Sequence, residues 1–438
     1  MLRSVADRLA GLLDAPITWW ARVGGWAVAT AAFAGGVLLG GGPSTGDTQL
    51  SVYATWAIAH GHLACAYPPG SVAGYTPAAP VWVLAAAAMA AALRLGASVP
   101  FPTAHALGAH CEHAGALIGA WSYHARALAP TVRLGYVAWA VLAAGVVALL
   151  AAAGRGRTRW EPLALVAVAL CPGTVMCLTE FFHPQDLVAM GLALAATAAV
   201  LRDRWAAAGV LLALATCAQQ FTLLVAVVLL VVVPARGRVR FVASAAVTVL
   251  VVALPLGALT SWRALPTVLA GSGESTAAGS LVVSLGLHGS AQFALARILP
   301  LALAALAAGV ALDRLKERAR TPGVLTALVA LAVALRLPFD VAIWGYYLMA
   351  TSVALVVCDV ARRRLRLGLL VWLVLTWVAE ADGAVIYAPR GVVVPSWCWQ
   401  VALDAGALAL AGSAVYGAMH EESSLAAGAA ALDSALSR

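Results

Sequence analysis

The chain has 438 residues, of which 63% are hydrophobic and only 11% charged, with a mean hydropathy of +0.92. Soluble domains are about half apolar and about a quarter charged, so this composition excludes an ordinary soluble enzyme and indicates an integral membrane protein. The formal net charge is +8, but the basic residues stand in short loops between apolar runs. There they indicate membrane orientation, and nucleic acid is excluded as a partner.

Apolar runs long enough for membrane helices recur along the whole chain. The runs are continuous and do not alternate with polar residues, which favours helices over barrel strands. The predicted fold is an all-α, polytopic transmembrane helical bundle of about 10–13 spans, with one domain over 1–420 and a short cytoplasmic tail over 421–438. The strongest runs are 24–40, 134–153, 162–178, 187–201, 206–233, 241–259, 293–312, 322–337, 341–361, 367–379 and 399–418.

Orientation follows from the arginines, which concentrate in short loops between the runs. Positively charged loops remain on the cytoplasmic side of a membrane, so these loops should be cytoplasmic and the loops between them should face outward. The first run has no cleavage-site pattern and is expected to be a retained anchor in the plasma membrane. The basic loops are 154–160, 202–205, 235–240, 313–320 and 361–366.

Two segments leave the number of crossings open. The chain must return inside before Arg155, so either 80–95 only dips into the interface or part of 104–123 crosses as well. The run 206–233 has basic loops on both sides and is interrupted by Gln219-Gln220. Two half-helices that meet at this polar pair would satisfy the orientation, because broken helices are tolerated where they line a cavity.

Polar and ionisable residues gather in the loops and helix ends that should face outward. Ionisable groups at membrane depth are costly and usually functional, although the alternative is that loops are simply polar. A random scatter would not place them all opposite the arginine loops. They are Asp47, Glu180, His183, Asp186, Gln219, Gln220, Glu274, His288, Arg336, Asp340, Tyr346, Tyr347, Glu380, Asp382 and Arg390.

Metal and disulfide patterns are weak in this sequence. His105, His110, His113 and His124 form a histidine cluster, but an interfacial polar face explains their spacing better than a metal site. Most cysteines lie inside apolar runs as small buried hydrophobes, and only Cys65 and Cys111 could meet outside. No cofactor is therefore predicted, and a metal requirement is left open.

The first outward loop carries the most distinctive pattern. Asp47 follows the first apolar run, and after it come an amphipathic stretch with Val52-Tyr53, a Tyr67-Pro-Pro turn and Tyr75-Thr76-Pro77. This layout, with short interfacial helices in the first outer loop, resembles the GT-C glycosyltransferases, and most nearly the polyprenol-phosphate mannosyltransferases of family 87. The resemblance implies that Asp47 is the catalytic base. The alternative is that Asp47 only caps the interfacial helix.

Two later segments also resemble this superfamily. Turns similar to His183-Pro-Gln-Asp186 occur in actinobacterial relatives of the superfamily. This resemblance implies that the His183 and Asp186 side chains bind donor phosphate or acceptor hydroxyls. The alternative is that His183 caps the next helix. The segment from Arg336 to Asp340, with Tyr346 and Tyr347 after it, resembles the late outer loop that holds donor phosphate. An arginine offers a fixed fork for phosphate and the tyrosines add hydrogen bonds; the alternative is an interfacial anchor.

One departure concerns the donor's charge partner. Family 87 proteins commonly carry a lysine where the broken helix turns, whereas this chain has Gln219 and Gln220 there. The whole chain contains a single lysine, Lys316, and its alanine and arginine content is typical of high-GC actinobacteria.

The resemblance implies an inverting enzyme that transfers a sugar, mannose or a pentose, from a polyprenyl-phosphate donor to an extracytoplasmic glycolipid or glycan among the membrane lipids. The alternatives are a transporter or lipid flippase, in which the broken helix would line a midplane path, and a non-catalytic partner in cell-envelope assembly.

Overall fold

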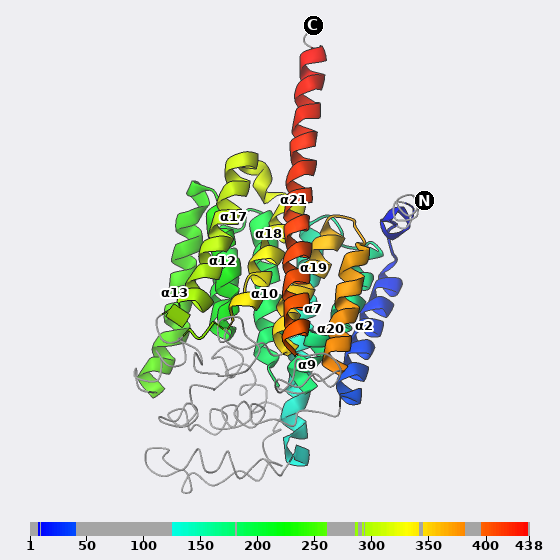
Figure 1. The fold of residues 1–438 in the computed structure, drawn as a ribbon, viewed down its shortest axis with the longest axis vertical. Helices are drawn as coiled ribbons and strands as arrows, with labels where there is room; N and C mark the ends of the chain where they lie inside the picture. Colours follow the sequence, from blue (N-terminus) through cyan, green and yellow to red (C-terminus); the bar gives the residue numbers. More distant parts are fainter. Residues whose placement is uncertain are drawn as a thin grey trace.

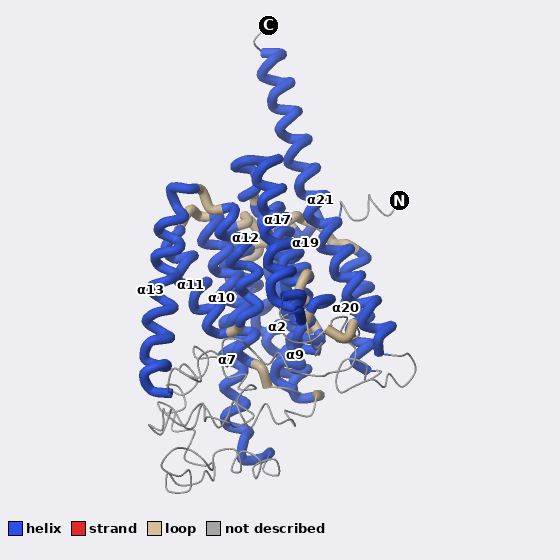
Figure 2. The backbone as a smooth tube through the Cα atoms, turned by 60° about the vertical axis from the view of Figure 1, so that its left-hand side comes forward, coloured by secondary structure: helices blue, strands red, loops and turns tan. Residues whose placement is uncertain are grey.

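The protein is an all-helical bundle, seen here in a computed structural model (Figure 1). The structure describes residues 8, 10–40, 125–179, 182–260, 285–287, 291–292, 294–340, 345–381 and 396–436. Within these ranges there is no β-strand, and the one isolated bridge joins Pro16 and Thr158. Figure 2 shows the long helices running side by side with short connections, as the apolar runs predict.

The helices follow the predicted runs closely. They are α2 (Trp19–Leu39), α7 (Ala125–Ala152), α8 (Trp160–Ala169), α9 (Pro172–Thr179), α10 (Pro184–Leu201), α11 (Trp205–Ala218), α12 (Leu223–Val232), α13 (Ala235–Thr260), α17 (Leu299–Leu315), α18 (Pro322–Ala334), α19 (Leu348–Ala361), α20 (Leu367–Ala381) and α21 (Ser396–Leu436). Short single turns lie between them: η5 (Gln220–Thr222), η6 (Ala294–Ile298), η7 (Lys316–Arg320), η8 (Leu337–Phe339) and η9 (Gly345–Tyr347).

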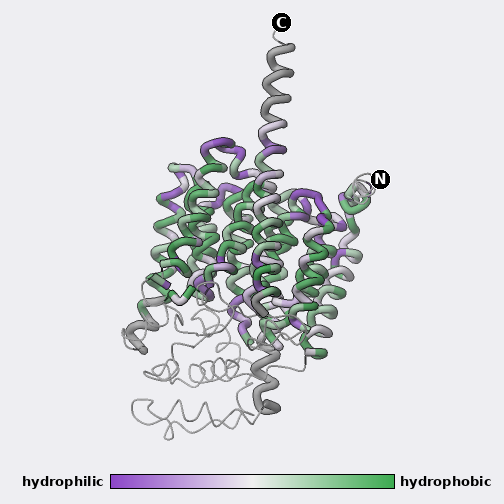
Figure 3. The backbone as a smooth tube through the Cα atoms, viewed as in Figure 1, coloured by the Kyte–Doolittle hydropathy of each residue, from purple (hydrophilic) through white to green (hydrophobic). Residues whose placement is uncertain are grey.

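The described helices are built for a bilayer. Six of them are long and apolar enough to cross a membrane, or up to seven if the bent pair α8–α9 is one span. Large apolar side chains on their outer surfaces are exposed, such as Trp20 at 78%, Leu370 at 59% and Leu254 at 50%. Such exposure would be unfavourable in water but matches contact with lipid. Figure 3 shows hydrophobic helix middles and hydrophilic segments near the helix ends. The protein is a multi-pass membrane protein.

The arginine loops lie together on one face of the bundle, which we call the basic face. Arg320 pairs with Asp203 at 3.3 Å, and Arg363 pairs with Asp14 at 3.3 Å. The backbone carbonyl of Arg157 accepts a hydrogen bond from the Ile17 amide beside Asp14. These contacts join loops far apart in sequence, so the predicted grouping of the loops is confirmed.

The carboxyl-terminal helix is attached to the same face. Arg362 donates to the Glu421 carboxylate at 3.1 Å, Arg364 pairs with the same carboxylate, and Arg318 donates to the Glu422 carbonyl at 3.0 Å. α21 continues without a break past these contacts to Leu436, so residues 421–436 extend the last helix beyond the basic face (Figure 1).

The run 206–233 forms the predicted pair of half-helices. Gln219 has extended backbone angles (φ −160°, ψ 134°), which end α11, and α12 starts one turn later. The beginning of α11 and the end of α12 both lie at the basic face, because Arg320 contacts the Trp205 ring and shares a cavity with Val232. With 14 residues, α11 reaches about 21 Å into the bundle. The two helices therefore form a hairpin whose tip is Gln219-Gln220.

One span that the sequence predicts as continuous is broken in the structure. The run 162–178 consists of α8 and α9, which meet at an angle of 49°. Pro172 begins α9, and proline lacks the amide that would continue the preceding helix, so the bend falls just before it. The bend leads the chain to the face opposite the arginine loops.

Close helix contacts depend on glycines. A Cβ at Gly145 in α7 would overlap the carbonyl oxygen of Gly191 in α10, and a Cβ at Gly209 in α11 would overlap that of Phe241 in α13. Small residues at membrane helix interfaces allow backbones to approach closely. These contacts fix the position of α10 and α11, whose ends carry the polar residues described next.

Candidate active site

Every predicted site residue within the described ranges comes to one place, at the face opposite the basic face. His183 and Asp186 lie at the start of α10, Gln219 and Gln220 at the hairpin tip, Arg336 and Asp340 at the end of α18 and η8, and Tyr346 and Tyr347 in η9. We call these eight residues the polar cluster. Each belongs to a helix end or a helix break, where the chain can place polar side chains at membrane depth.

The hairpin tip is tied to α10 by a short hydrogen bond. Gln219 Nε2 donates to Asp186 Oδ1 at 2.5 Å, and the Asp186 side chain is almost fully buried. Gln219 Oε1 accepts the backbone amide of Gln220 at 3.1 Å, which places the second glutamine beside the first. A buried carboxylate needs such donors to offset its lost hydration, so this bond holds the broken helix in position.

His183 belongs to an aromatic and amide network. Its ring stacks on Tyr346 with centroids 4.0 Å apart, and Tyr346 meets Tyr347 edge-on at 4.7 Å. His183 Nδ1 is 3.0 Å from Gln185 Nε2 and 3.9 Å from Asp186 Oδ2. Pro184 occupies the first turn of α10 as predicted, and His183 is the N-cap residue of that helix, although its side chain makes no capping hydrogen bond.

Arg336 is the main cation of the cluster. Its Nε donates to Asp340 Oδ2 at 2.5 Å, and its guanidinium lies 3.9 Å from the Tyr347 ring centroid and 5.6 Å from that of Phe221. The Arg336 side chain is only 13% exposed, so it does not reach outward as a membrane anchor. Among the described residues, no hydrogen bond engages its two terminal nitrogens.

Sequence reasoning missed Arg297. It lies in η6, and its Nη1 is 3.7 Å from Asp340 Oδ1. Asp340, itself 1% exposed, therefore lies between two arginines. Arg297 sits inside the predicted apolar run 293–312, and an ionisable residue in such a run was the signal that could have identified it.

Glu380 approaches the cluster from α20. An added Cβ at Gly345 would lie 2.9 Å from Glu380 Oε2 and would overlap the end of the Met176 side chain. The absence of a side chain at Gly345 thus lets α9, α20 and η9 meet beside Tyr346. Gln185 is fully buried at the same level, and its Oε1 has no hydrogen-bond partner among the described residues.

The arrangement suits recognition of a phosphate and a hydroxylated ligand. Arg336 is fixed by Asp340 and by the Tyr347 ring, so its two terminal nitrogens are preoriented to donate to an anion. Asp186, His183 and Gln219 supply the mixed donors and acceptors that recognition of a hydroxyl-rich group requires. Fixed groups of this kind stabilise developing charge at little cost in reorganisation.

The remaining predicted polar residues lie outside the described residues: Asp47, Glu180, Glu274, His288, Asp382 and Arg390, as do Cys65, Cys111 and the four histidines of 105–124. The segments 80–95 and 104–123 also lie there. α2 ends and α7 begins at the face opposite the basic face, on either side of the residues 41–124 that are not described. α7 therefore returns the chain to the basic face, and both alternatives for 80–95 and 104–123 stay open. Within the described ranges, no group of three His, Cys, Asp or Glu could hold a metal.

Comparisons with protein-family models, with curated proteins and with solved structures found no match.

Proposed function

We propose that the protein is an inverting glycosyltransferase of the GT-C type, with about 10–13 spans. It transfers mannose or a pentose from a polyprenyl-phosphate donor to an extracytoplasmic lipid or glycan acceptor. The observation that carries the proposal is Arg336, a buried arginine held by Asp340 and Tyr347, whose two terminal nitrogens make no hydrogen bond within the described ranges. Its position opposite the basic face supports an outward-facing site in the plasma membrane.

The reaction balances without a further reactant. The acceptor hydroxyl oxygen forms a bond to the anomeric carbon while the bond from that carbon to the phosphate oxygen breaks. The leaving group is polyprenyl phosphate, which gains negative charge, and Arg336 stabilises that charge. The acceptor proton passes to a carboxylate acting as general base. In this proposal His183, Asp186, Gln219 and Gln220 orient the sugar and the acceptor, with Tyr346 and Tyr347 lining the phosphate position.

The proposed base is Asp47, and the ends of the described chain are compatible with this role. A Cβ at Gly40, just after α2, would touch the Thr179 side chain, four residues before His183 in the cluster. Asp47 stands seven positions after Gly40 in the sequence, and seven residues of chain span at most about 25 Å. The end of α2 therefore leaves Asp47 within reach of the cluster.

A transporter or lipid flippase is the second candidate, and the α11–α12 hairpin favours it. Transporters bind substrate at broken helices near the membrane midplane. Here, however, the break meets Asp186 in the first turn of α10, near the end of a span. A site near the end of a span suits transfer to an acceptor outside the membrane better than it suits transport across the midplane. A non-catalytic assembly partner remains the third alternative.

The test is a transfer assay with the purified protein in vesicles. Radiolabelled polyprenyl-phosphate mannose and polyprenyl-phosphate pentose are supplied with a glycolipid extract, with and without a chelator. We expect labelled glycolipid and an equal amount of released polyprenyl phosphate from one of the donors. Movement of intact donor between leaflets without release of polyprenyl phosphate would support the flippase instead. If neither labelled product nor donor movement were detected, the result would favour the non-catalytic assembly partner.

A further inference from the structure

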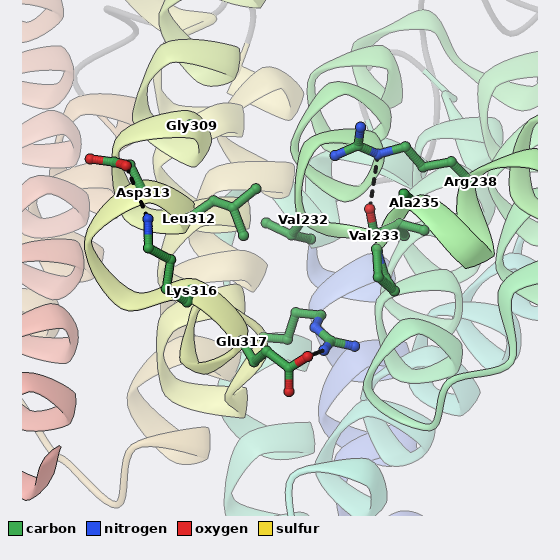
Figure 4. Close-up of a pocket in the computed structure, with 11 residues that line it drawn as sticks. Val232, Val233, Ala235, Arg238, Gly309, Leu312, Asp313, Lys316 and Glu317 are labelled. Carbon is green, nitrogen blue, oxygen red and sulfur yellow. Dashed lines mark hydrogen bonds and ion pairs between the residues drawn. The ribbon is translucent and has the colours of Figure 1, made fainter.

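A cavity of about 510 Å³ opens on the basic face, far from the polar cluster. One wall is the turn between α12 and α13, and the other is the end of α17 with η7 (Figure 4). Val232, Val233 and Leu312 form its apolar floor. The proposed transfer reaction makes no use of this cavity.

The cavity lies where apolar helices end. α12 ends at Val232 and α17 at Leu315, so the cavity is at the level where lipid headgroups meet the protein. Large apolar side chains deeper in the same two helices are exposed: Leu230 at 39%, Val310 at 40% and Leu306 at 63%. They lie about half a turn, about one and a half turns and about two and a half turns before the ends of their helices. A molecule in the cavity would therefore have water on one side and hydrocarbon on the other.

Three cations line the cavity, and their arrangement leaves donors for an anion. Arg238 Nε and Nη2 donate to the Val233 and Val231 carbonyls at 3.0 and 3.1 Å, which fixes the guanidinium and leaves Nη1 (Figure 4). Lys316 pairs with Asp313 at 3.2 Å, but these side chains are 75% and 83% exposed. Such an exposed pair contributes little and can open.

The third cation, Arg320, is held more firmly. It is 16% exposed and pairs with Asp203 at 3.3 Å and with Glu317 at 3.7 Å. Within the lining, three positive charges face the two carboxylates of Asp313 and Glu317, while Asp203, which also pairs with Arg320, lies outside the lining. The amino terminus of α13 adds the positive end of its helix dipole, since Ala235 also lines the cavity.

We propose that this cavity binds the phosphate headgroup of an anionic phospholipid from the leaflet at the basic face. The cations and the α13 amino terminus hold the phosphate, the apolar floor receives the glycerol and the first methylenes, and the acyl chains run down beside Leu306 and Val310. Basic pockets between membrane helices have this combination of charge and apolar access. A free phosphate would bind to the cations but would make no contact with the apolar floor.

The experiment uses native mass spectrometry of the detergent-purified protein titrated with phosphatidylglycerol. Wild type should show one saturable site. Lys316→Gln should weaken binding about fivefold, as expected for one basic side chain near an anionic headgroup. Glutamine keeps a Cβ, so the strain of the positive φ of 53° at this position is unchanged. Arg238→Gln should weaken binding at least as much.

The matched control is Arg314→Gln, which removes an equal charge two residues before Lys316. The Arg314 side chain is exposed and does not line the cavity. It should leave binding unchanged. Equal weakening by Arg314→Gln, or none by Lys316→Gln in a protein with wild-type thermal stability, would overturn the proposal. Displacement of the lipid by an equal concentration of inorganic phosphate would overturn the lipid source in favour of a free anion.

Discussion

Asp47→Asn should reduce turnover by roughly 100- to 10,000-fold while donor affinity stays near the wild-type value, because asparagine keeps the size of the side chain but cannot take the acceptor proton. The measurement is release of polyprenyl phosphate at saturating donor, with donor affinity determined separately by titration. Asp186→Asn should have a smaller effect on turnover, since Asp186 already accepts a hydrogen bond from Gln219 and acts in binding.

The matched control for this substitution is Asp313→Asn, on an 83% exposed side chain of the basic face, which should change neither quantity. Full activity in Asp47→Asn would contradict the assignment of the base. A large loss of turnover in Asp186→Asn together with normal turnover in Asp47→Asn would transfer the role to the buried carboxylate of α10.

Arg336→Gln should weaken donor binding about 10- to 100-fold, because hydrogen bonds to charged groups contribute about 1.5–3 kcal/mol each. The single substitution also removes the Arg336 partner of the buried Asp340 carboxylate, while Arg297 stays 3.7 Å away. Removing one partner of a buried pair costs about 3–5 kcal/mol of folding stability. The loss of binding must therefore be separated from a loss of folded protein.

The double variant Arg336→Gln/Asp340→Asn makes that separation, since it removes both charges and keeps side chains that can hydrogen-bond. We expect its thermal stability to return toward wild type while donor binding stays as weak as in Arg336→Gln. Asp340→Asn alone keeps the cation and should bind donor at least as well as wild type. If donor affinity recovered together with stability in the double variant, Arg336 would be a structural residue and not a phosphate ligand.

Much of this arrangement could be predicted from the sequence, and the reason is physical. A bilayer requires continuous apolar runs and sorts arginines to one side, so both the helices and the basic face follow from composition and order. The break at Gln219-Gln220 was also predictable, because a run between two basic loops must turn back. The sequence also predicts that His183, Asp186, Arg336 and Asp340 lie on one side of the membrane, because their segments alternate with the arginine loops along the chain.

The pairings inside the cluster could not be predicted. Sequence order does not reveal that Gln219 reaches Asp186 or that Arg297 shares Asp340 with Arg336, since these contacts depend on how separate helices pack. The stacking of His183 on Tyr346 likewise joins α10 to η9 across a long interval of sequence. Pro172, in contrast, was visible in its apolar run and marks the bend between α8 and α9.

The most direct measurement is photocrosslinking of a polyprenyl-phosphate sugar analogue that carries its reactive group beside the phosphate. Donor binding at the polar cluster predicts labelled peptides from 336–347, 183–186 or 219–222, with labelling reduced by excess unmodified donor and by Arg336→Gln/Asp340→Asn. A donor site at Arg336 would be contradicted by labelling that is unchanged in the double variant and that falls elsewhere. Such labelling would lie on lipid-facing helices such as α13 and α20, or at the basic face around Lys316.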